Sequence, residues 1–171
     1  MQVFLPETAR EHLGYSQNIN ALPFHARFTR DIGNFHVTAF ECIHDAECNG
    51  YLIEHTEFGR LIFATDTEYV KYRFKGLNHI LVECNYSQEI INERYHQGLR
   101  DRVISSHMEL ETCKGFAQAN NNPQLRNVCL LHSSDATSDE KLFKDEMQKI
   151  VSCPVYIANK GLEIELGETP F

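Results

Sequence analysis

The sequence lacks any apolar run of transmembrane length, which argues against a membrane-spanning helix. Residues 1–22 lack both the basic start and the apolar core of a secretory signal. Internal repeats, low-complexity stretches and linkers that would divide the chain are also absent. We therefore expect residues 1–171 to form a single domain of a cytoplasmic protein with no membrane partner.

Closely spaced cysteines are also absent, since no Cys-x-x-Cys pair of the kind found in structural zinc sites occurs. The six cysteines are Cys42, Cys48, Cys84, Cys113, Cys129 and Cys153. Four of them lie in or beside apolar runs, where a reduced cysteine acts as a small hydrophobe. Cys42 and Cys48 flank His44 and can touch its loop. The simplest interpretation is nevertheless that all six are reduced and structurally inert.

Positive charge is scarce, because 16 Lys and Arg residues face 24 Asp and Glu residues and the net charge is −8. This balance argues against a protein that grips nucleic acid with its whole surface. A phosphate substrate at a metal site remains compatible with it, because bound divalent ions supply positive charge locally. The hydrophobic content of 42% is ordinary for a globular protein.

The chain is organised around residues 40–70, where two metal-type ligands stand at the ends of neighbouring apolar runs. The first run leads to His44, a turn follows at Gly59, and a later run ends on Asp66. Strands joined by short turns lie side by side, so His44 and Asp66 can face one site. An imidazole and a carboxylate suit a zinc or manganese ion that activates water. The alternative is a loop histidine and a strand-end cap.

Hydrophobic periodicity predicts an α/β fold, with a mixed, largely antiparallel sheet and helices packed on it. Apolar runs predict strands before Pro6 and at residues 35–41, 51–54, 61–65, 79–84, 127–131, 155–158 and 162–166. Capping residues and apolar stripes predict helices at residues 7–13, 87–99 and 138–151, and one that follows 105–107 and ends at 120–123.

Three further residues stand at the ends of predicted elements. His132 follows the run NVCLL. Considered by itself, a histidine in this place is more often a core residue with satisfied hydrogen bonds. Considered together with His44 and Asp66, it becomes a third candidate ligand at a third strand end. Glu83 ends the run HILVE and is also compatible with a strand-terminal cap. His107 is predicted at a helix N-terminus, where the helix dipole disfavours its charged form.

A basic and aromatic patch occupies residues 69–75, YVKYRFK. Its cations Lys71, Arg73 and Lys75 can contact a phosphate chain while the aromatic rings offer stacking faces. The more common alternative for such a patch is a solvated loop.

The patterns His-Asp-Ala at 44–46, Gly-Tyr-Leu-Ile at 50–53 and Ala-Thr-Asp-Thr at 64–67 resemble the middle of the metallo-β-lactamase fold. The resemblance is to the branch that includes ribonuclease Z and related phosphodiesterases and exonucleases, and it covers most of the chain. It implies the later part of an αββα sandwich.

The resemblance also implies roles for five residues. His44, Asp66 and His132 would be metal ligands, with Asp66 bridging two Zn²⁺ or Mn²⁺ ions. Glu83 would orient the catalytic machinery, and His107 would help to protonate the leaving oxygen. The expected activity is metal-dependent hydrolysis of a phosphoester, of nuclease or cyclic-nucleotide phosphodiesterase type, with a nucleic acid or nucleotide as substrate.

The most diagnostic signature of this family, His-x-His-x-Asp-His, is absent from the sequence. The remaining ligands are too few for two ions, because a catalytic zinc normally draws three ligands from protein. Three explanations follow: a second chain or fragment supplies the missing ligands, residues 1–171 are a truncated domain, or the protein is a catalytically inactive binding or regulatory module. In the third case, exposed Val3, Phe4 and Leu5 could join a partner's sheet edge.

Overall fold

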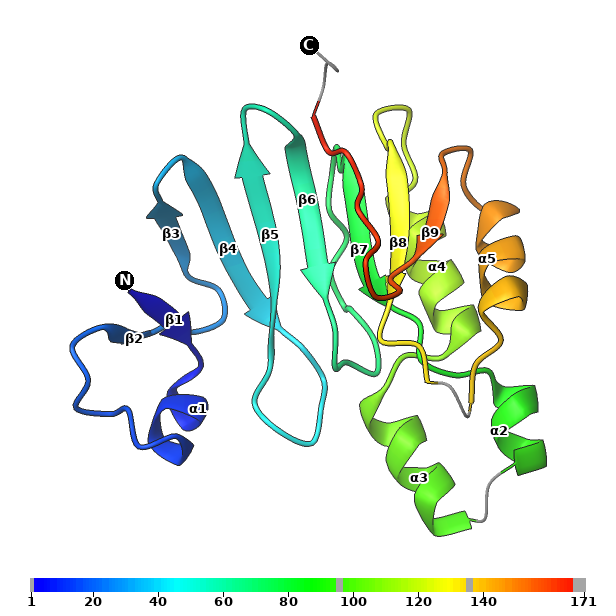
Figure 1. Cartoon of the computed structure of the whole chain (residues 1–171), viewed down its shortest axis with the longest axis horizontal. Helices are drawn as coiled ribbons and strands as arrows, with labels where there is room; N and C mark the ends of the chain where they lie inside the picture. The colour runs from blue at the N-terminus through cyan, green and yellow to red at the C-terminus, as the bar shows by residue number, and fades with distance from the viewer. Residues whose placement is uncertain (1, 95–96, 135–136, 168–171) are drawn as a thin grey trace.

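A mixed seven-stranded sheet forms the centre of the molecule (Figure 1). The structure is a computed structural model that describes residues 2–94, 97–134 and 137–167. The order of the strands is the order of the chain, with antiparallel pairing from β3 to β6 and parallel pairing from β6 to β9. The strands are β3 (Thr29–Ile32), β4 (Phe35–Glu41), β5 (Asn49–His55), β6 (Gly59–Ala64), β7 (His79–Glu83), β8 (Asn127–Leu131) and β9 (Val155–Ile157).

The helices are α1 (Glu7–His12), α2 (Gln88–Arg94), α3 (Gln97–Ser106), α4 (Leu110–Asn120) and α5 (Glu140–Gln148). Helices α4 and α5 cover one face of the parallel half of the sheet, while α2 and α3 lie beyond one end of the strands (Figure 1). Among the described residues, no helix has the length and apolarity needed to cross a membrane.

The main core lies between the sheet and helices α4 and α5. Ile62, Ile80 and Leu130 contribute fully buried side chains from the strands, and Phe143 and Met147 contribute them from α5. The runs HILVE and NVCLL form adjacent parallel strands, which explains their nearly continuous apolar character. The predicted mixed α/β architecture is confirmed.

A small N-terminal unit packs beside β4 and β5 through a second cluster centred on Phe24 and Ala39. In this unit β1 (Val3–Leu5) pairs in parallel with β2 (Ala21–Pro23). Val3 is 47% exposed, whereas Phe4 and Leu5 are half-buried. One edge of β1 is therefore already paired, and addition of β1 to a partner's sheet stays a prediction.

Local signals predicted most elements, including the turn at Gly59, whose φ of +80° suits glycine. The single helix predicted at 87–99 is wrong, because α2 ends at Arg94 and α3 begins at Gln97; residues 95–96 lie outside the described part. The strand predicted at 162–166 is also wrong, since these residues form no ladder. Strand β2 was missed because it has only three residues and ends on a proline, and β3 was missed because it is short and polar.

Candidate metal centre

The candidate ligands meet at one edge of the sheet because of the strand directions. β4, β6, β7 and β8 all run the same way, since β4 is two antiparallel steps from β6 and the others are parallel. Their carboxyl ends therefore share an edge, the usual place for a site in an α/β sheet. His44 follows β4, Asp66 follows β6, Glu83 ends β7 and His132 follows β8.

Asp66 and His132 both have left-handed backbone conformations, with φ of 54° and 55°. Residues other than glycine rarely adopt such values, and they concentrate at functional sites. Neighbouring hydrogen bonds hold both positions. Thr67 N donates to Glu83 Oε2 at 2.7 Å, and Asn85 Nδ2 donates to the His132 carbonyl at 2.7 Å. The fold thus maintains two strained residues at the ends of β6 and β8, on either side of β7.

The structure brings Asp66, His107 and His132 into one group whose ligand atoms all lie within 4.8 Å of one another. His132 Nδ1 lies 3.6 Å from Asp66 Oδ1, and His44 Nε2 lies 4.0 Å from the same oxygen. The side chains of Asp66 and His132 are 39% and 42% exposed. Solvent and small solutes can therefore reach the group from the open side.

His44 has a fixed tautomer. Its Nδ1 lies 2.9 Å from the carbonyl oxygen of Ser106, and because a carbonyl only accepts, Nδ1–H is the donor. In the neutral ring the lone pair is then on Nε2, which lies 3.1 Å from Asp45 Oδ1 and faces Asp66. A proton or a metal cation between this lone pair and the two carboxylates stabilises the arrangement.

Glu83 lies behind the ligands with no exposed surface. Its Oε1 is 2.7 Å from His107 Nδ1 and 3.0 Å from His132 Nδ1. Burial raises the pKa of Glu83 to about 8, and the Thr67 N–H bond opposes this rise. When ionised, Glu83 can accept a hydrogen bond from Nδ1 of both rings, which leaves both Nε2 atoms available to a cation.

His107, predicted as a catalytic residue at a helix N-terminus, lies beside Asp66 and His132 in a different local structure, and its catalytic role stays a prediction. It follows the C-terminus of α3, and its N–H donates to the Val103 carbonyl at 3.0 Å; the predicted helix N-terminus is wrong. A helix C-terminus favours the charged imidazole. Burial nevertheless lowers the pKa of His107, as do the nearby His132 and His44. The neutral ring is therefore favoured by burial and not by the helix dipole.

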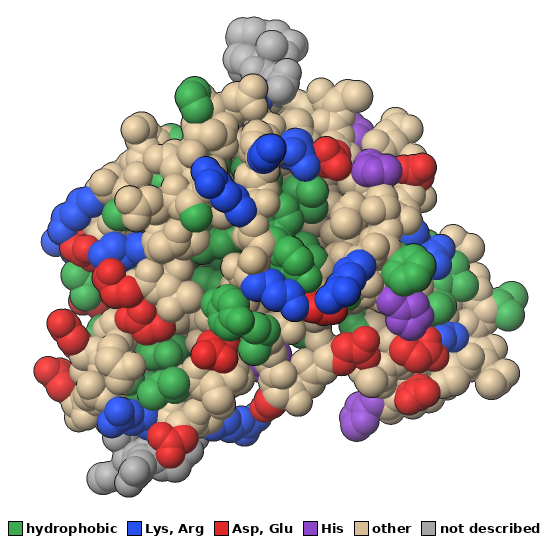
Figure 2. Space-filling view, turned by 180° about the vertical axis from the view of Figure 1, so that it is seen from behind, with side chains coloured by type: hydrophobic (Ala, Val, Ile, Leu, Met, Phe, Trp, Pro, Cys, Tyr) green, Lys and Arg blue, Asp and Glu red, His purple; other side chains and the backbone are tan. Residues whose placement is uncertain are grey.

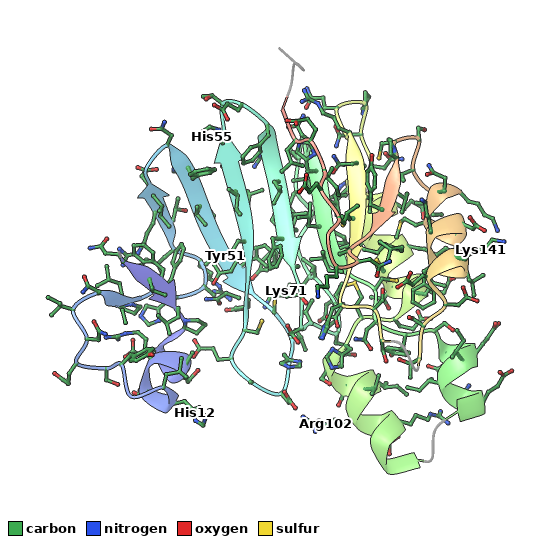
Figure 3. The ribbon with its side chains drawn as sticks, viewed as in Figure 1. His12, Tyr51, His55, Lys71, Arg102 and Lys141 are labelled. Carbon is green, nitrogen blue, oxygen red and sulfur yellow. The ribbon has the colours of Figure 1, made fainter. Side chains whose placement is uncertain are left out.

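Asp45 and Arg102 complete the rim of the site, and neither was predicted from the sequence as a site residue. Asp45 Oδ2 lies 3.5 Å from a guanidinium nitrogen of Arg102, which comes from α3 (Figure 3). Arg102 is 76% exposed, so its charge is available to solutes. Only the position of Asp45 next to His44 hinted at its contact with the imidazole.

The basic and aromatic patch is largely engaged with the rest of the protein. Lys71 pairs with Glu41, and Arg27 lies 3.0 Å from the same carboxylate. Tyr72 and Phe74 pack against the main core. On the face seen from behind, basic and acidic side chains are interspersed (Figure 2). These contacts favour a structural role for much of the patch, while nucleic-acid binding stays a prediction.

The donor set fits one divalent cation. Two ligands each about 2.0–2.2 Å from a tetrahedral zinc ion lie about 3.3–3.6 Å apart, so atoms within 4.8 Å of one another need to close by about 1.5 Å at most. Across residues 2–94, 97–134 and 137–167, this is the one group of three or more His, Cys, Asp or Glu that meets the distance criterion. The ligands available to a second ion would be His44 and Asp66, and Asp66 would be shared with the first ion.

Comparison with known proteins identifies the architecture. No protein family model and no curated protein matches the sequence. The metallo-β-lactamase fold protein YhfI from Bacillus subtilis matches the structure with a TM-score of 0.71 and 15% identity, covering 94% of this chain and 63% of that one.

Two phosphate-active proteins match as well. A diphosphatase of the PhnP family has a TM-score of 0.59 and 15% identity, covering 96% of this chain and 58% of that one. Human tRNase Z, short form, has a TM-score of 0.57 and 12% identity, and the match covers 96% of this chain and 67% of that one. Other matches include a β-hydroxylase and an isothiocyanate hydrolase.

The chain thus spans less than two thirds of the length of YhfI and of the diphosphatase. Sequence identities this low show the fold alone. The chain has the metallo-β-lactamase fold, as its sequence resemblance predicted.

Proposed function

We propose that this protein is a metal-dependent hydrolase that acts on phosphoesters. The observation that carries the proposal is the group of Asp66, His107 and His132 at an accessible sheet edge, backed by the buried Glu83. The diphosphatase and the tRNase with the same fold support a phosphoester substrate. Because one fold serves many chemistries, the substrate class is part of the proposal.

The proposed ion is Zn²⁺ or Mn²⁺, held by Asp66 and His132 with His107 or His44. When bound, such an ion supplies a water of lowered pKa and a positive charge for the phosphoryl oxygens. Glu83 holds the rings of His107 and His132 through their Nδ1 atoms. If two ions were bound, Asp66 would be their shared ligand and His44 would hold the second ion.

His107 has two possible roles that experiment can separate. As a ligand it would bind through Nε2, since Nδ1 contacts Glu83. As the proton donor implied by the family resemblance, it would hold a proton on Nε2 for the leaving oxygen. Loss of a ligand lowers metal content, whereas loss of a proton donor lowers turnover and leaves the metal bound.

Arg102 is the cation that we propose to bind a substrate phosphate at the rim. Its exposed guanidinium lies beside Asp45, which contacts His44. A planar guanidinium matches phosphate oxygens in bidentate fashion. A nucleotide or a nucleic-acid end is therefore the proposed substrate chemistry.

A second candidate function is a binding or regulatory module without turnover. The limited donor set favours it, because the described group is sufficient for one ion only. A second chain that carries His-x-His-x-Asp-His would instead restore the hydrolase. The two cases differ in whether addition of such a fragment creates activity.

The test combines metal analysis with hydrolysis of bis(p-nitrophenyl) phosphate. The purified chain is loaded with Zn²⁺ or Mn²⁺, desalted and analysed for bound metal, beside Asp66→Asn, His132→Ala, His107→Ala and the control His36→Ala. His36 is an exposed histidine paired with Asp31 on β3 and β4, away from the group. We expect stoichiometric metal and turnover in the wild type and the control, and loss of both in Asp66→Asn and His132→Ala.

Bound metal without turnover, alone or with the added fragment, would support the binding module. No bound metal above background in the wild type would contradict the proposed hydrolase. Turnover that appears only with the fragment would support a site completed by a second chain.

A further inference from the structure

Cys42 and Cys48 face one another across the base of the loop that carries His44. The last ladder pair between β4 and β5 joins Glu41 and Asn49, so the next opposed pair is Cys42 and Cys48. The N–H of Cys42 donates to the Cys48 carbonyl at 3.1 Å, which extends the ladder by that pair. Both residues are half-buried, whereas the other four cysteines are buried.

The register also places the two side chains together. Directly opposed residues of an antiparallel pair project their side chains from the same face of the ladder. The Cys48 thiol donates to the Thr65 carbonyl at 3.5 Å, directly after the next strand, β6.

We propose that Cys42 and Cys48 are a reversible disulfide site that closes the loop bearing His44 and Asp45. Directly opposed residues of an antiparallel pair have Cα atoms about 4.5–5.5 Å apart. A disulfide requires about 4.4–6.8 Å, so the Cα separation of this ladder pair suits a bridge. The inference is independent of the proposed hydrolase activity.

The oxidant is a low-molecular-weight disulfide. The thiolate of one cysteine attacks one sulfur of this disulfide, which breaks its S–S bond and releases the first small thiol. The second cysteine loses its proton and attacks the mixed disulfide, which releases the second small thiol. The protein loses two hydrogen atoms, and the small disulfide is reduced to two thiols.

The other four cysteines provide the contrast within the same chain. Cys84, Cys113, Cys129 and Cys153 are all buried. Cys84 and Cys113 have no exposed surface at all. Burial of this kind leaves a thiol unreactive toward a soluble disulfide.

The test is titration of the full chain with glutathione redox buffers in the presence of a chelator. After free thiols are alkylated, a protease that cleaves after Glu47 separates the two cysteines, and mass spectrometry identifies linked peptides. We expect one linked pair, Cys42 with Cys48, lost on reduction, while the four buried cysteines remain alkylatable after unfolding. Cys42→Ser and Cys48→Ser should each stop at a mixed disulfide with glutathione.

A second readout does not depend on variants. Hydrogen exchange of the amides at 43–47 should slow on oxidation of the wild type, with exchange in α5 unchanged. The proposal is overturned if Cys42 and Cys48 gain glutathione without forming the linked pair. It is equally overturned if both remain free, or if either links to a buried cysteine.

Discussion

The Nδ1 atom of His107 lies 2.7 Å from Oε1 of Glu83, a carboxyl with no exposed surface. The same oxygen lies 3.0 Å from His132 Nδ1. One buried group at the end of β7 therefore orients the imidazoles that follow α3 and β8. An ionised carboxylate in that place is costly unless its hydrogen bonds are satisfied, which explains why its partners are so close.

Substitution Glu83→Gln tests this orientation. Glutamine keeps the shape but has a single accepting oxygen, so it cannot accept from the imidazoles at the Oε1 position and from the Thr67 N–H at the Oε2 position together. We expect metal affinity to fall about 10–100-fold while the chain stays folded. Competition with a chromogenic chelator measures the affinity, and Glu54→Gln, at the remote end of β5, is the control. Equal affinities in both variants would show that Glu83 does not orient the ligands.

The strained backbone at His132 predicts a dependence on side-chain type. Asparagine tolerates the φ of 55°, whereas a β-branched residue does not. His132→Val should therefore unfold more easily than His132→Asn by about 1–2 kcal/mol. Urea denaturation of both variants gives the difference. Equal stabilities would mean that this position relaxes to an ordinary conformation.

The buried His79 predicts a pH dependence of stability that is separate from the site. Burial lowers the pKa of His79 below 6.5, so below that pH the folded chain binds fewer protons than the unfolded chain. The free energy of unfolding is then lost as pH falls, by at most about 1.4 kcal/mol per pH unit between the two pKa values.

Substitution His79→Gln isolates this effect, because all other titrating groups remain. We expect the wild type to lose more stability than the variant between about pH 7 and about pH 5. Thermal unfolding across this range measures both slopes. Parallel slopes would contradict the lowered pKa of His79.

The close approach of Gly50 to Phe40 predicts the cost of one methyl group. A Cβ at Gly50 would lie 2.3 Å from the Phe40 ring, which is buried. Gly50→Ala should therefore cost about 1–3 kcal/mol. Gly115 in α4 has open space around it, and Gly115→Ala should instead stabilise by about 0.5–1 kcal/mol. Urea denaturation compares the two; a neutral Gly50→Ala would disprove the tight contact.

The sequence predicted the elements whose apolar pattern is strong and failed where the pattern is weak. The runs at β7 and β8 were unambiguous because both faces of these strands are covered. The short strand β3 carries Thr, Arg and Asp, so only pairing with β4 makes it a strand. The separate α3 was missed because its apolar stripe is weak, and this error misplaced His107.

The sequence by itself determined the residue types of the site and their places at strand ends. His44, Asp66 and His132 follow apolar runs, and any chain that buries those runs delivers them to strand ends.

The tertiary structure alone decided that these ends share one edge, because strand direction depends on pairing between distant segments. It also decided that His107 joins Asp66 and His132, and that Glu83 lies behind the two imidazoles. Such contacts join residues 24 to 49 positions apart, and only the pairing of β8 with β7 and the position of α3 beyond the strand ends fix them.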